Sequence, residues 1–385
     1  MNDTLENSTS PSHFEIVSVS NRQQQKQFLN FPWTLYAGDE NWVPPLRHRQ
    51  KQLVNFARHP FYEEAEAQTF LAFKDGQVAG RIAAIIDRAH NAYYKERRGM
   101  FGFFECIDDQ QVAHGLLRAA QDWHAERGNT CMRGPLNPSM NYECGLLIDG
   151  FDSPPTFMMT YNPEYYAGLL DSYGMEKAQD LFAFYGHLSM LDNLDPKIDF
   201  VTQEAARRFN VKVRPMKPSN FDYEIKTFMD IYNSSVAGNW GFVPMSKSEL
   251  VEVGKGLKNL IVPELTAIGE VDGRSVGIVF GLLDYNQIIK KTDGRLFPFG
   301  FLRFLFQKKT IKRVRMVSTN VKPEFQRWGL VMVLFKDIVQ RAIPWGIEDA
   351  EFSWVLESNQ LSRGSLERGG AKKIKTYRIY DYNWS

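Results

Sequence analysis

Residues 75–87 read DGQVAGRIAAIID and residues 272–284 read DGRSVGIVFGLLD, and the two stretches align without a gap. Each follows an apolar run, at residues 70–73 in the first case and 265–268 in the second. An Asp-Gly pair between two such runs is a strong signal of a β-hairpin, because the tight turn needs residues that adopt positive φ. The chain therefore contains the same hairpin once in each half.

A second repeated signal lies further along each half. Residues 171–177 (DSYGMEK) match residues 367–373 (ERGGAKK), and both contain the glycine that ends a helix before a strand. Around these markers each half reads strand, one or two helices, hairpin, strand, long helix, strand, short helix, strand. We therefore expect an α+β fold with a mixed α/β sheet, built from two copies of one unit.

The elements of the two copies can be placed from periodicity and turn residues. In the second copy we expect strands at 211–214, 314–321 and 350–356, and helices at 223–237 and 246–257. In the first copy we expect strands at 100–106 and 130–133, and a helix at 109–127. A long helix should follow residue 330, because five apolar residues there share one helical face: Val331, Leu334, Phe335, Ile338 and Ala342.

The repeat also divides the chain into domains. We expect a flexible N-terminus at 1–13, an N-terminal domain at 14–190, a linker at 191–210 and a C-terminal domain at 211–385. Asp, Asn and Pro residues at 192–196 are typical of such a linker. Two long insertions interrupt the copies, at 139–162 and at 285–310. Long extra segments of this aromatic composition are usually functional.

Composition limits the classes of function. The 385 residues carry 46 basic and 45 acidic side chains, a formal net charge of +1. This balance argues against a nucleic-acid partner, because such proteins carry a large basic excess. No apolar run approaches the ~18 residues of a membrane-spanning helix, and no signal peptide is apparent at residues 1–8. Since the three cysteines lack metal-ligand spacing, we expect a cytoplasmic protein in a reducing compartment, with no bound metal.

The placement of histidine narrows the chemistry further. All seven histidines lie in the first half, which excludes a Ser-His-Asp or Cys-His site built from the second half alone. The chain has no HExxH, CxxC, GxxxxGK(S/T) or GxGxxG motif. Zinc, P-loop and dinucleotide sites therefore lose most of their support.

One strand-to-helix junction carries a ligand-binding pattern, and residues 317–331 there read VSTNVKPEFQRWGLV. A glycine at the start of a helix lets the backbone approach a ligand closely, and the free N–H groups of the first turn bind phosphate. Gln326, Arg327 and Gly329 would meet a pyrophosphate at this point. The candidate cofactor-binding residues of the junction are Asn320, Val321, Gln326, Arg327, Trp328, Gly329 and Leu330.

This junction resembles the acyl-CoA-binding loop of the GNAT acyltransferase superfamily, (Q/R)-x-x-G-x-(G/A). Gln326 and Gly329 fit the pattern, but Val331 replaces the final Gly or Ala and narrows the room over the pyrophosphate. Residues 357–371 resemble a second segment of the superfamily, in which an asparagine precedes a helix, with Ala371 in place of the usual aromatic residue. The resemblance adds Asn359 to the cofactor-binding candidates, although an asparagine here is also a typical helix N-cap.

Five further stretches resemble the bacterial ceramide synthase-like family of tandem GNAT acyltransferases. They are FPWTLY at 31–36, NWVPPL at 41–46, GPLNPS at 134–139, GLLIDGF at 145–151 and NWGFVP at 239–244. The resemblance covers most of residues 14–383. It implies two tandem GNAT-like acyl-CoA N-acyltransferase domains with acyl-CoA as co-substrate. The implied reaction moves a fatty acyl group to the primary amine of a small molecule or lipid, such as a sphingoid base.

The two copies differ at the junction itself. The first copy reads FECIDDQQVAHG at 104–115, without the glycine pattern. Asp108 and Asp109 would repel a pyrophosphate at the helix start. We therefore expect the first copy to be a degenerate GNAT-like domain that holds no cofactor and forms a wall of the acceptor pocket.

The chemistry that the resemblance implies is direct attack of a neutral amine on the thioester. The enzyme must take a proton from an ammonium group with a pKa of about 10 and stabilise an oxyanion. Backbone N–H groups at 317–321 suit the oxyanion, above all if a bulge splays that strand. The candidate bases are Glu143 and Glu357, each of which also fits a surface charge. The candidate acceptor-binding residues are Asn137, Asn141, Tyr142 and Asn239.

The insertion of the second copy is both basic and aromatic. From residue 294 to residue 322 there is no acidic residue, and eight Lys and Arg residues accompany eight Leu and Phe residues. Such a segment, at 296–315, suits peripheral contact with the inner face of the membrane. A buried helix or strand with a solvated basic end is the alternative. The apolar residues of insertion 139–162 fit an acyl tunnel or an ordinary part of the core.

Two other functions stay open. The first is a tandem-GNAT transferase that uses aminoacyl-tRNA, against which the near-neutral charge weighs. The second is a catalytically degenerate protein that binds acyl chains or a partner. Val331 and the lack of the superfamily's catalytic tyrosine in the short helix would both allow the second function.

Overall fold

The computed structural model describes residues 14–193, 196–298 and 300–384, without the side chains of residues 192, 193, 196, 198, 305 and 327. Residues 1–13, the predicted flexible N-terminus, lie outside this part. The first half contains β1 (Phe14–Ser18), α1 (Arg22–Leu35), α2 (Arg47–Leu53), η1 (Pro60–Glu63), β2 (Ala65–Lys74), β3 (Gln77–Asp87), α3 (Arg88–Tyr94), β4 (Arg98–Cys106), α4 (Gln110–Ala125), β5 (Cys131–Gly134), β6 (Leu136–Asn137), β7 (Glu143–Cys144), β8 (Leu146–Asp149), α5 (Tyr166–Tyr173) and β9 (Glu176–His187).

The second half repeats this order and adds helices to it. It contains η2 (Leu188–Asn193), α6 (Pro196–Arg208), β10 (Lys212–Arg214), η3 (Pro218–Asn220), α7 (Phe221–Val236), α8 (Lys247–Leu257), η4 (Pro263–Leu265), β11 (Thr266–Val271), β12 (Arg274–Leu283), α9 (Asn286–Lys291), α10 (Gly300–Phe306), η5 (Lys308–Thr310), β13 (Arg313–Val321), η6 (Pro323–Trp328), α11 (Leu330–Trp345), β14 (Asp349–Leu356), α12 (Gln360–Arg368) and β15 (Lys372–Asn383). The mixed α/β fold predicted from the repeat is confirmed.

The repeated hairpins are β2–β3 and β11–β12. Their turns are Asp75-Gly76 and Asp272-Gly273, and all four residues have positive φ, between 49° and 77°. This is the backbone conformation that an Asp-Gly turn favours, because the twist of such a turn matches the twist of the strands. The prediction of one hairpin in each half is therefore confirmed.

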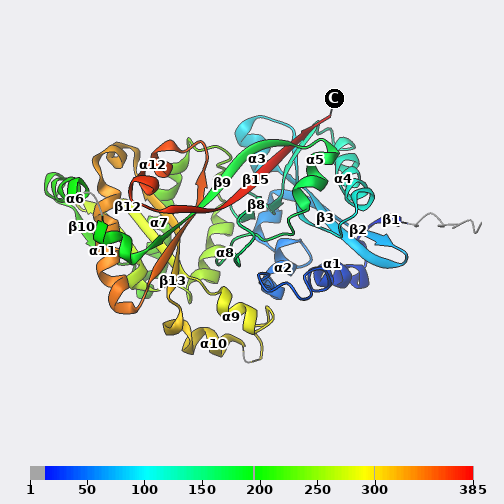
Figure 1. The fold of residues 1–385 in the computed structure, drawn as a ribbon. Coiled ribbons are helices and arrows are strands. Elements are labelled where there is room, and N and C mark those ends of the chain that lie inside the picture. The colour runs from blue at the N-terminus through cyan, green and yellow to red at the C-terminus, as the bar shows by residue number, and fades with distance from the viewer. Residues whose placement is uncertain (1–13, 194–195, 299, 385) are drawn as a thin grey trace, which may run out of the picture.

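The final strands of the two halves are exchanged between the halves. β9 closes the first half in sequence, yet it pairs with β14 of the second half, while β15 pairs with β5 of the first half. β9 and β15 also pair with each other over most of their length. In Figure 1 the two long strands cross the centre of the molecule, and β15 ends beside the helices of the first half. One continuous sheet therefore joins the halves, with thirteen strands in the described part.

Helices α7 and α11 cover opposite faces of the sheet in the second half. On β12 the ring of Phe280 packs against Phe228 of α7, with centroids 5.6 Å apart. A side chain at Gly277 would instead point at Leu334 of α11. Because residues 277 and 280 are an odd number apart, their side chains lie on opposite faces of the strand. These faces are called the α7 face and the α11 face below.

Parallel strands β13 and β14 separate after a short paired stretch. They pair from Arg313 with Asp349 to Met316 with Phe352, and no further. On its other side β13 carries a bulge, because Phe280 pairs with Ser318 whereas Gly281 pairs with Met316. Val317 is thus the extra residue of this bulge. An opening forms between the two strands at this point.

The segment between the halves is not simply extended. Residues 191–210, the predicted linker, include helix α6, which packs along α11. Thr202 and Ala205 of α6 are buried, which gives this helix its place against α11. No helix in the described part is long and apolar enough to cross a membrane.

Candidate active site

A cavity of about 840 Å³ surrounds the opening between β13 and β14, and residues from both faces of the sheet line it. Helices α7 and α8 and the insertion 139–162 contribute from one side, and α11 contributes from the other. Ligand sites in proteins commonly have volumes of about 300–1,000 Å³. One end is apolar, with Ile225, Phe228, Met229, Leu250, Val253, Leu257 and Ile261 in its wall.

A buried charge network fastens the first-half insertion to the strands beside this opening. Arg315 of β13 is 3% exposed and donates to the carbonyl oxygen of Phe157 at 3.1 Å and to the hydroxyl of Ser353 at 3.0 Å. Glu351, which pairs with Arg315 across β13 and β14, accepts from Ser353 at 2.7 Å and from the hydroxyl of Thr156. Burial lowers the pKa of the Arg315 guanidinium, and the negative charge of Glu351 opposes that change. Both halves therefore build one side of the cavity.

Glu143 lies close enough to Arg315 for the two charges to act on each other. Arg315 pairs across the sheet with Leu282, two residues from Phe280, and so lies on the α7 face. The Glu143 carboxyl lines the cavity, and no hydrogen bond restrains it among the described residues. Burial raises the pKa of this carboxyl, while the charges of Arg315 and Arg49 lower it in part. A carboxylate with these properties can accept a proton from a ligand in the cavity.

The predicted cofactor corner lies at the α11 face. Gly329 has φ +73° and precedes α11, and it lines the cavity together with Gln326 and Val331. The side-chain amide of Gln326 donates to the carbonyl oxygen of Val321 at 3.0 Å and so holds the turn. Backbone N–H groups at the start of α11 lack a side-chain cap, which is the arrangement that an anion can complete.

Other predicted residues of this corner have different environments. Asn320 donates to the hydroxyl of Ser318 at 2.6 Å and lines the cavity. Leu330 is fully buried, so only its backbone is available to a ligand. Trp328 is 43% exposed, and the guanidinium of Arg208 lies 3.9 Å from its ring centre. The side chain of Arg327 lies outside the described residues.

Helix α6 covers part of the corner. A Cβ at Gly329 would come within 2.8 Å of the side chain of Val201 on α6. The helix is held along α11 by an exposed ion pair of 2.8 Å between Asp199 and Lys336. Val201 lines the cavity and is 45% exposed. The space in front of Gly329 is therefore bounded by the segment that was predicted to be a linker.

The two remaining candidates near β14 are placed differently. Asn359 lines the cavity, and its side-chain oxygen accepts from the backbone N–H of Ser362 at 3.1 Å, so it also caps α12. Glu357 forms a 2.7 Å ion pair with Lys177 and is not among the residues that line the cavity. The structure therefore brings Asn359 and Glu143 to one cavity and leaves Glu357 outside it.

Three predicted acceptor-binding residues make contacts within the protein. The side-chain oxygen of Asn137 accepts from the backbone N–H of Phe103 at 2.6 Å. Asn141 donates to the carbonyl oxygen of Val243 at 3.0 Å. Tyr142 is 6% exposed and donates to the carboxylate of Glu249 at 2.9 Å. Asn141 and Tyr142 line the cavity while they tie the insertion to the second half.

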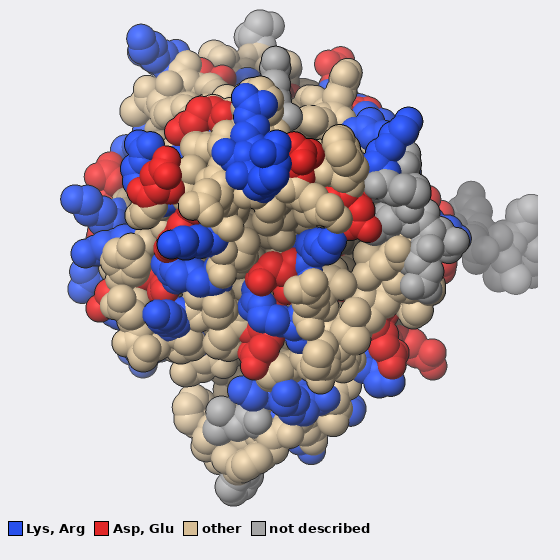
Figure 2. Space-filling model, turned by 90° about the vertical axis from the view of Figure 1, so that its left-hand side faces the viewer, with Lys and Arg blue, Asp and Glu red and all other residues tan. Residues whose placement is uncertain are grey.

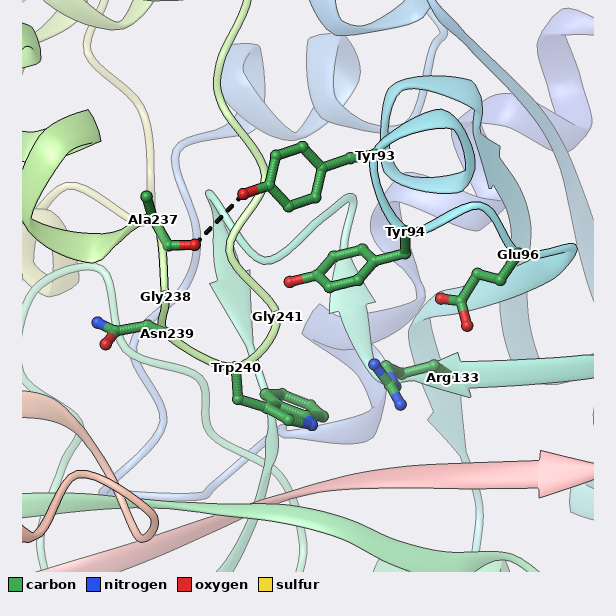
Figure 3. A pocket seen from close by; sticks show the side chains of 9 residues that line it. All are labelled: Tyr93, Tyr94, Glu96, Arg133, Ala237, Gly238, Asn239, Trp240 and Gly241. Atoms are coloured by element: carbon green, nitrogen blue, oxygen red, sulfur yellow. Dashed lines mark hydrogen bonds between the residues drawn. The ribbon is translucent and has the colours of Figure 1, made fainter.

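Asn239 lies in a wall between the cavity and a second pocket of about 360 Å³. Figure 3 shows the second pocket, where Tyr93, Tyr94 and Glu96 face the loop that carries Asn239 and Trp240. The guanidinium of Arg133 lies over the ring of Trp240, 4.5 Å from its centre. Asn239, Trp240 and Gly241 line both spaces, so this loop separates the large cavity from the surface pocket.

The equivalent corner of the first half is filled by its own side chains. The carboxylate of Asp109 accepts from backbone N–H groups at the start of α4, at 2.9 and 3.2 Å, and pairs with Lys74. Glu105 on β4 accepts hydrogen bonds from Tyr36 and Tyr166, at 2.7 and 2.9 Å. A protein carboxylate thus occupies the donors that a phosphate would use. This arrangement supports a first half that holds no cofactor.

Sequence reasoning missed Arg315 and Glu351. Both lie within segments that were predicted to be strands, at 314–321 and 350–356, among residues of apolar character. A charged residue inside each of two otherwise apolar predicted strands could have indicated that the two charges are buried close to each other.

Comparison with solved structures identifies the class of protein. A tandem GNAT protein from the clavulanic acid biosynthesis pathway matches with a TM-score of 0.56 and 8% identity, over 96% of this chain and 98% of that one. A glucosamine N-acetyltransferase region of a fungal multidomain β-N-acetylglucosaminidase matches with a TM-score of 0.58 and 15% identity, over 97% of this chain and 38% of that one. The chain therefore has the tandem GNAT fold.

Comparison with curated sequences identifies the family. The chain is 34% identical to bacterial ceramide synthase of Caulobacter vibrioides, over 95% of this chain and 96% of that protein. It is 33% identical to protein YghO of Escherichia coli, over 94% of this chain and 93% of that protein. No family model matches the chain. The chain belongs to the family of bacterial ceramide synthase.

Proposed function

We propose that the protein transfers a fatty acyl group from a CoA thioester to the primary amine of a long-chain acceptor, with a sphingoid base as the leading candidate. One observation carries this proposal. A single cavity connects the uncapped helix start at Gly329, on the α11 face, with the carboxyl of Glu143, on the α7 face. The opening between β13 and β14 lies between these two points.

The proposed arrangement places the diphosphate of CoA on the α11 face of the sheet, and the acyl chain and the acceptor amine on the α7 face. The diphosphate of CoA would contact the N–H groups at the start of α11, and the thioester would reach into the opening between the strands. The acyl chain would extend along the apolar wall of α7 and α8, where burial of apolar surface favours a long chain. Asn359 and Gln326 line the cavity that would hold the diphosphate and the thioester.

The acceptor amine would approach Glu143 from the α7 face. The ammonium group has a pKa of about 10 in water, so it must lose a proton before it can attack. In the proposed step Glu143 takes this proton, the amine nitrogen bonds to the thioester carbon, and the carbon–sulfur bond breaks. The nitrogen loses a second proton as the amide forms, and the CoA thiolate takes up that proton. Backbone N–H groups near the bulge at Val317 would stabilise the oxyanion.

The step as written uses acyl-CoA and an amine, and no metal ion takes part in it. The proposed location is the cytoplasm, with peripheral contact between the inner face of the membrane and the part of segment 296–315 that precedes Ile311, because Ile311, Val314 and Arg315 are buried. Fatty acyl groups and long-chain amines both partition into bilayers, which gives such a contact a purpose. Nucleic acid is not among the proposed partners, because the net charge is only +1.

Calorimetric titration with acetyl-CoA and palmitoyl-CoA tests the donor half of the proposal. We expect palmitoyl-CoA to bind more tightly, because only its chain can fill the apolar end of the cavity. If neither thioester binds, the proposal is contradicted. A mass-spectrometric screen of amine acceptors with the purified protein tests the other half, and we expect amide products from long-chain amines.

Two outcomes would favour the other functions. Tight binding of acyl-CoA without any amide product from the acceptor screen would indicate a degenerate protein that binds acyl chains. Transfer from aminoacyl-tRNA, but not from acyl-CoA, would indicate the tRNA-dependent reaction.

A further inference from the structure

The insertion of the second half forms a lobe that comprises α9, α10 and η5, residues 286–310. This α9–α10 lobe is fixed to the first half at its base. The carboxylate of Asp293 accepts from the indole N–H of Trp33 at 2.5 Å and pairs with Arg47 at 2.9 Å. The carbonyl oxygen of Gly294 accepts from the backbone N–H of Arg47 at 3.1 Å. The lobe is therefore held in a defined position on the molecule.

The outer surface of the lobe exposes large apolar side chains. Phe297 is 79% exposed and Phe306 is 78% exposed, while Phe301 and Leu302 are 40% and 36% exposed. Phe304 points the other way, because its ring stacks on that of Tyr285 with centroids 5.4 Å apart. One side of helix α10 thus packs on the core, and no described residue covers its other side. Contiguous apolar surface of this kind usually marks an interaction site.

Cations surround this apolar surface. Among the described residues of 286–312, Asp293 is the one acidic residue. Its carboxylate pairs with Arg47 at the base of the lobe. Lys312 pairs with Glu348, and the ammonium of Lys309 lies over the ring of Trp345. No ion pair with a described carboxylate is formed by Lys291, Arg303 and Lys308, and Arg303 donates to the carbonyl oxygen of Lys291 at 3.0 Å. The lobe forms the lower end of the molecule in Figure 1, and in the space-filling view of Figure 2 blue Lys and Arg side chains border an uncharged surface at this end.

We propose that the α9–α10 lobe docks on bilayers that contain anionic phospholipid. Phe297, Phe301 and Phe306 enter the boundary between headgroups and acyl chains, and the cations contact lipid phosphates. A projecting lobe with outward rings fits a bilayer, because a bilayer needs no complementary groove. The excess of positive charge on the lobe selects an anionic surface. This inference deepens the membrane contact of the proposed function, but lipid binding itself requires no acyl transfer.

Vesicle flotation tests the proposal with the full-length protein. We expect binding to vesicles of phosphatidylcholine with phosphatidylglycerol, weaker binding to phosphatidylcholine alone, and weakening by salt. The double variant Phe297→Ser and Phe306→Ser should bind about tenfold or more weakly, because each substitution removes a ring that would bury apolar area in the bilayer. Phe200→Ser is the matched control, because Phe200 is 67% exposed on α6 and far from the lobe in sequence.

A charge variant separates the two parts of the contact. Arg303→Glu should reduce binding to anionic vesicles severalfold, whereas Lys255→Glu, at an exposed position on α8, should leave it unchanged. Thermal unfolding of each variant checks the fold. Equal flotation of the double variant and the Phe200 control would overturn the proposal, as would equal binding to both lipid mixtures.

The same proteins distinguish this proposal from the proposed function. If the lobe binds membranes but no thioester binds the protein, the acyltransferase proposal fails and the lobe proposal stands. If palmitoyl-CoA binds and reacts while vesicles do not bind, the lobe proposal fails alone.

Discussion

The side-chain oxygen of Asn137 accepts a hydrogen bond of 2.6 Å from the backbone N–H of Phe103. Phe103 belongs to the bulge of β4, where the register with β3 shifts and φ is +51°. In the second half, the bulge residue Val317 instead lines the cavity. One copy has thus closed its bulge with its own side chain, and the other copy leaves the equivalent region accessible to a ligand.

Asn137→Ala should therefore destabilise the fold. A partly buried N–H group would lose its acceptor, at a cost of about 1–3 kcal/mol in the free energy of unfolding. Denaturant unfolding measures this change. The Michaelis constant for the acceptor should not change, whereas a rise in that constant with unchanged stability would restore Asn137 as an acceptor-binding residue.

Glu143→Gln should lower turnover by about 10²–10⁴-fold, the usual contribution of a positioned base, and raise the Michaelis constant for acyl-CoA much less. Steady-state kinetics with palmitoyl-CoA measures both. Glu357→Gln is the matched control, since its ion pair with Lys177 lies outside the cavity, and it should retain turnover. Unchanged turnover of the Glu143 variant would remove this residue from the mechanism.

The pH profile offers a separate test of Glu143. A base must be deprotonated to act, so turnover should rise with pH through the pKa of this carboxyl. Because burial raises that pKa, the midpoint should lie above the usual glutamate value of about 4.3. A profile without this acid limb in the wild-type protein would contradict the assignment.

Gly329→Ala should weaken the binding of acyl-CoA, since the residue has φ +73° and faces Val201 at close range. Gly273→Ala is the matched control, because Gly273 has the same φ of +73° but open space around it. Backbone strain alone should cost both variants about 1–2 kcal/mol of stability, and the contact with Val201 adds to this loss in the Gly329 variant. Calorimetry should find weaker acyl-CoA binding for the Gly329 variant alone.

Glu351→Gln should destabilise the protein, because it removes the negative charge that acts most strongly on the buried Arg315 guanidinium, to which Glu351 is linked through the hydroxyl of Ser353. Disturbing a buried hydrogen bond to a charged group typically costs about 1.5–3 kcal/mol. Glu348→Gln removes the exposed pair with Lys312 and should cost less than about 1 kcal/mol. Equal losses for the two variants in denaturant unfolding would show that the network does not hold the insertion.

Local chemistry predicted much of the scaffold. The Asp-Gly turns and the buried face of α11 follow from residues that are close in sequence. The sequence also led to the corner at Gly329 and to Glu143, which share one cavity. The predicted carboxylate of Asp109 does occupy the start of α4 in the first half.

Contacts between distant residues could not be predicted in the same way. Tyr142 was a candidate for the acceptor site, but its hydroxyl meets Glu249, a partner that no local pattern indicates. The strand exchange has the same origin. β9 and β15 are both long strands with buried centres, so spacing alone does not reveal which of them adjoins β5. Helix α6 was missed because its few buried residues face α11, which lies more than a hundred positions later.

The exchange of β9 and β15 bears on how the protein is made. While the ribosome is still synthesising the second half, β5 has no β15 beside it, and its backbone groups form an open edge. During synthesis the first half therefore folds without β15, the strand that completes its side of the sheet. A nascent chain that stalled before residue 372 would expose that edge to chaperones and to other copies, and separate expression of either half would leave an unfinished sheet.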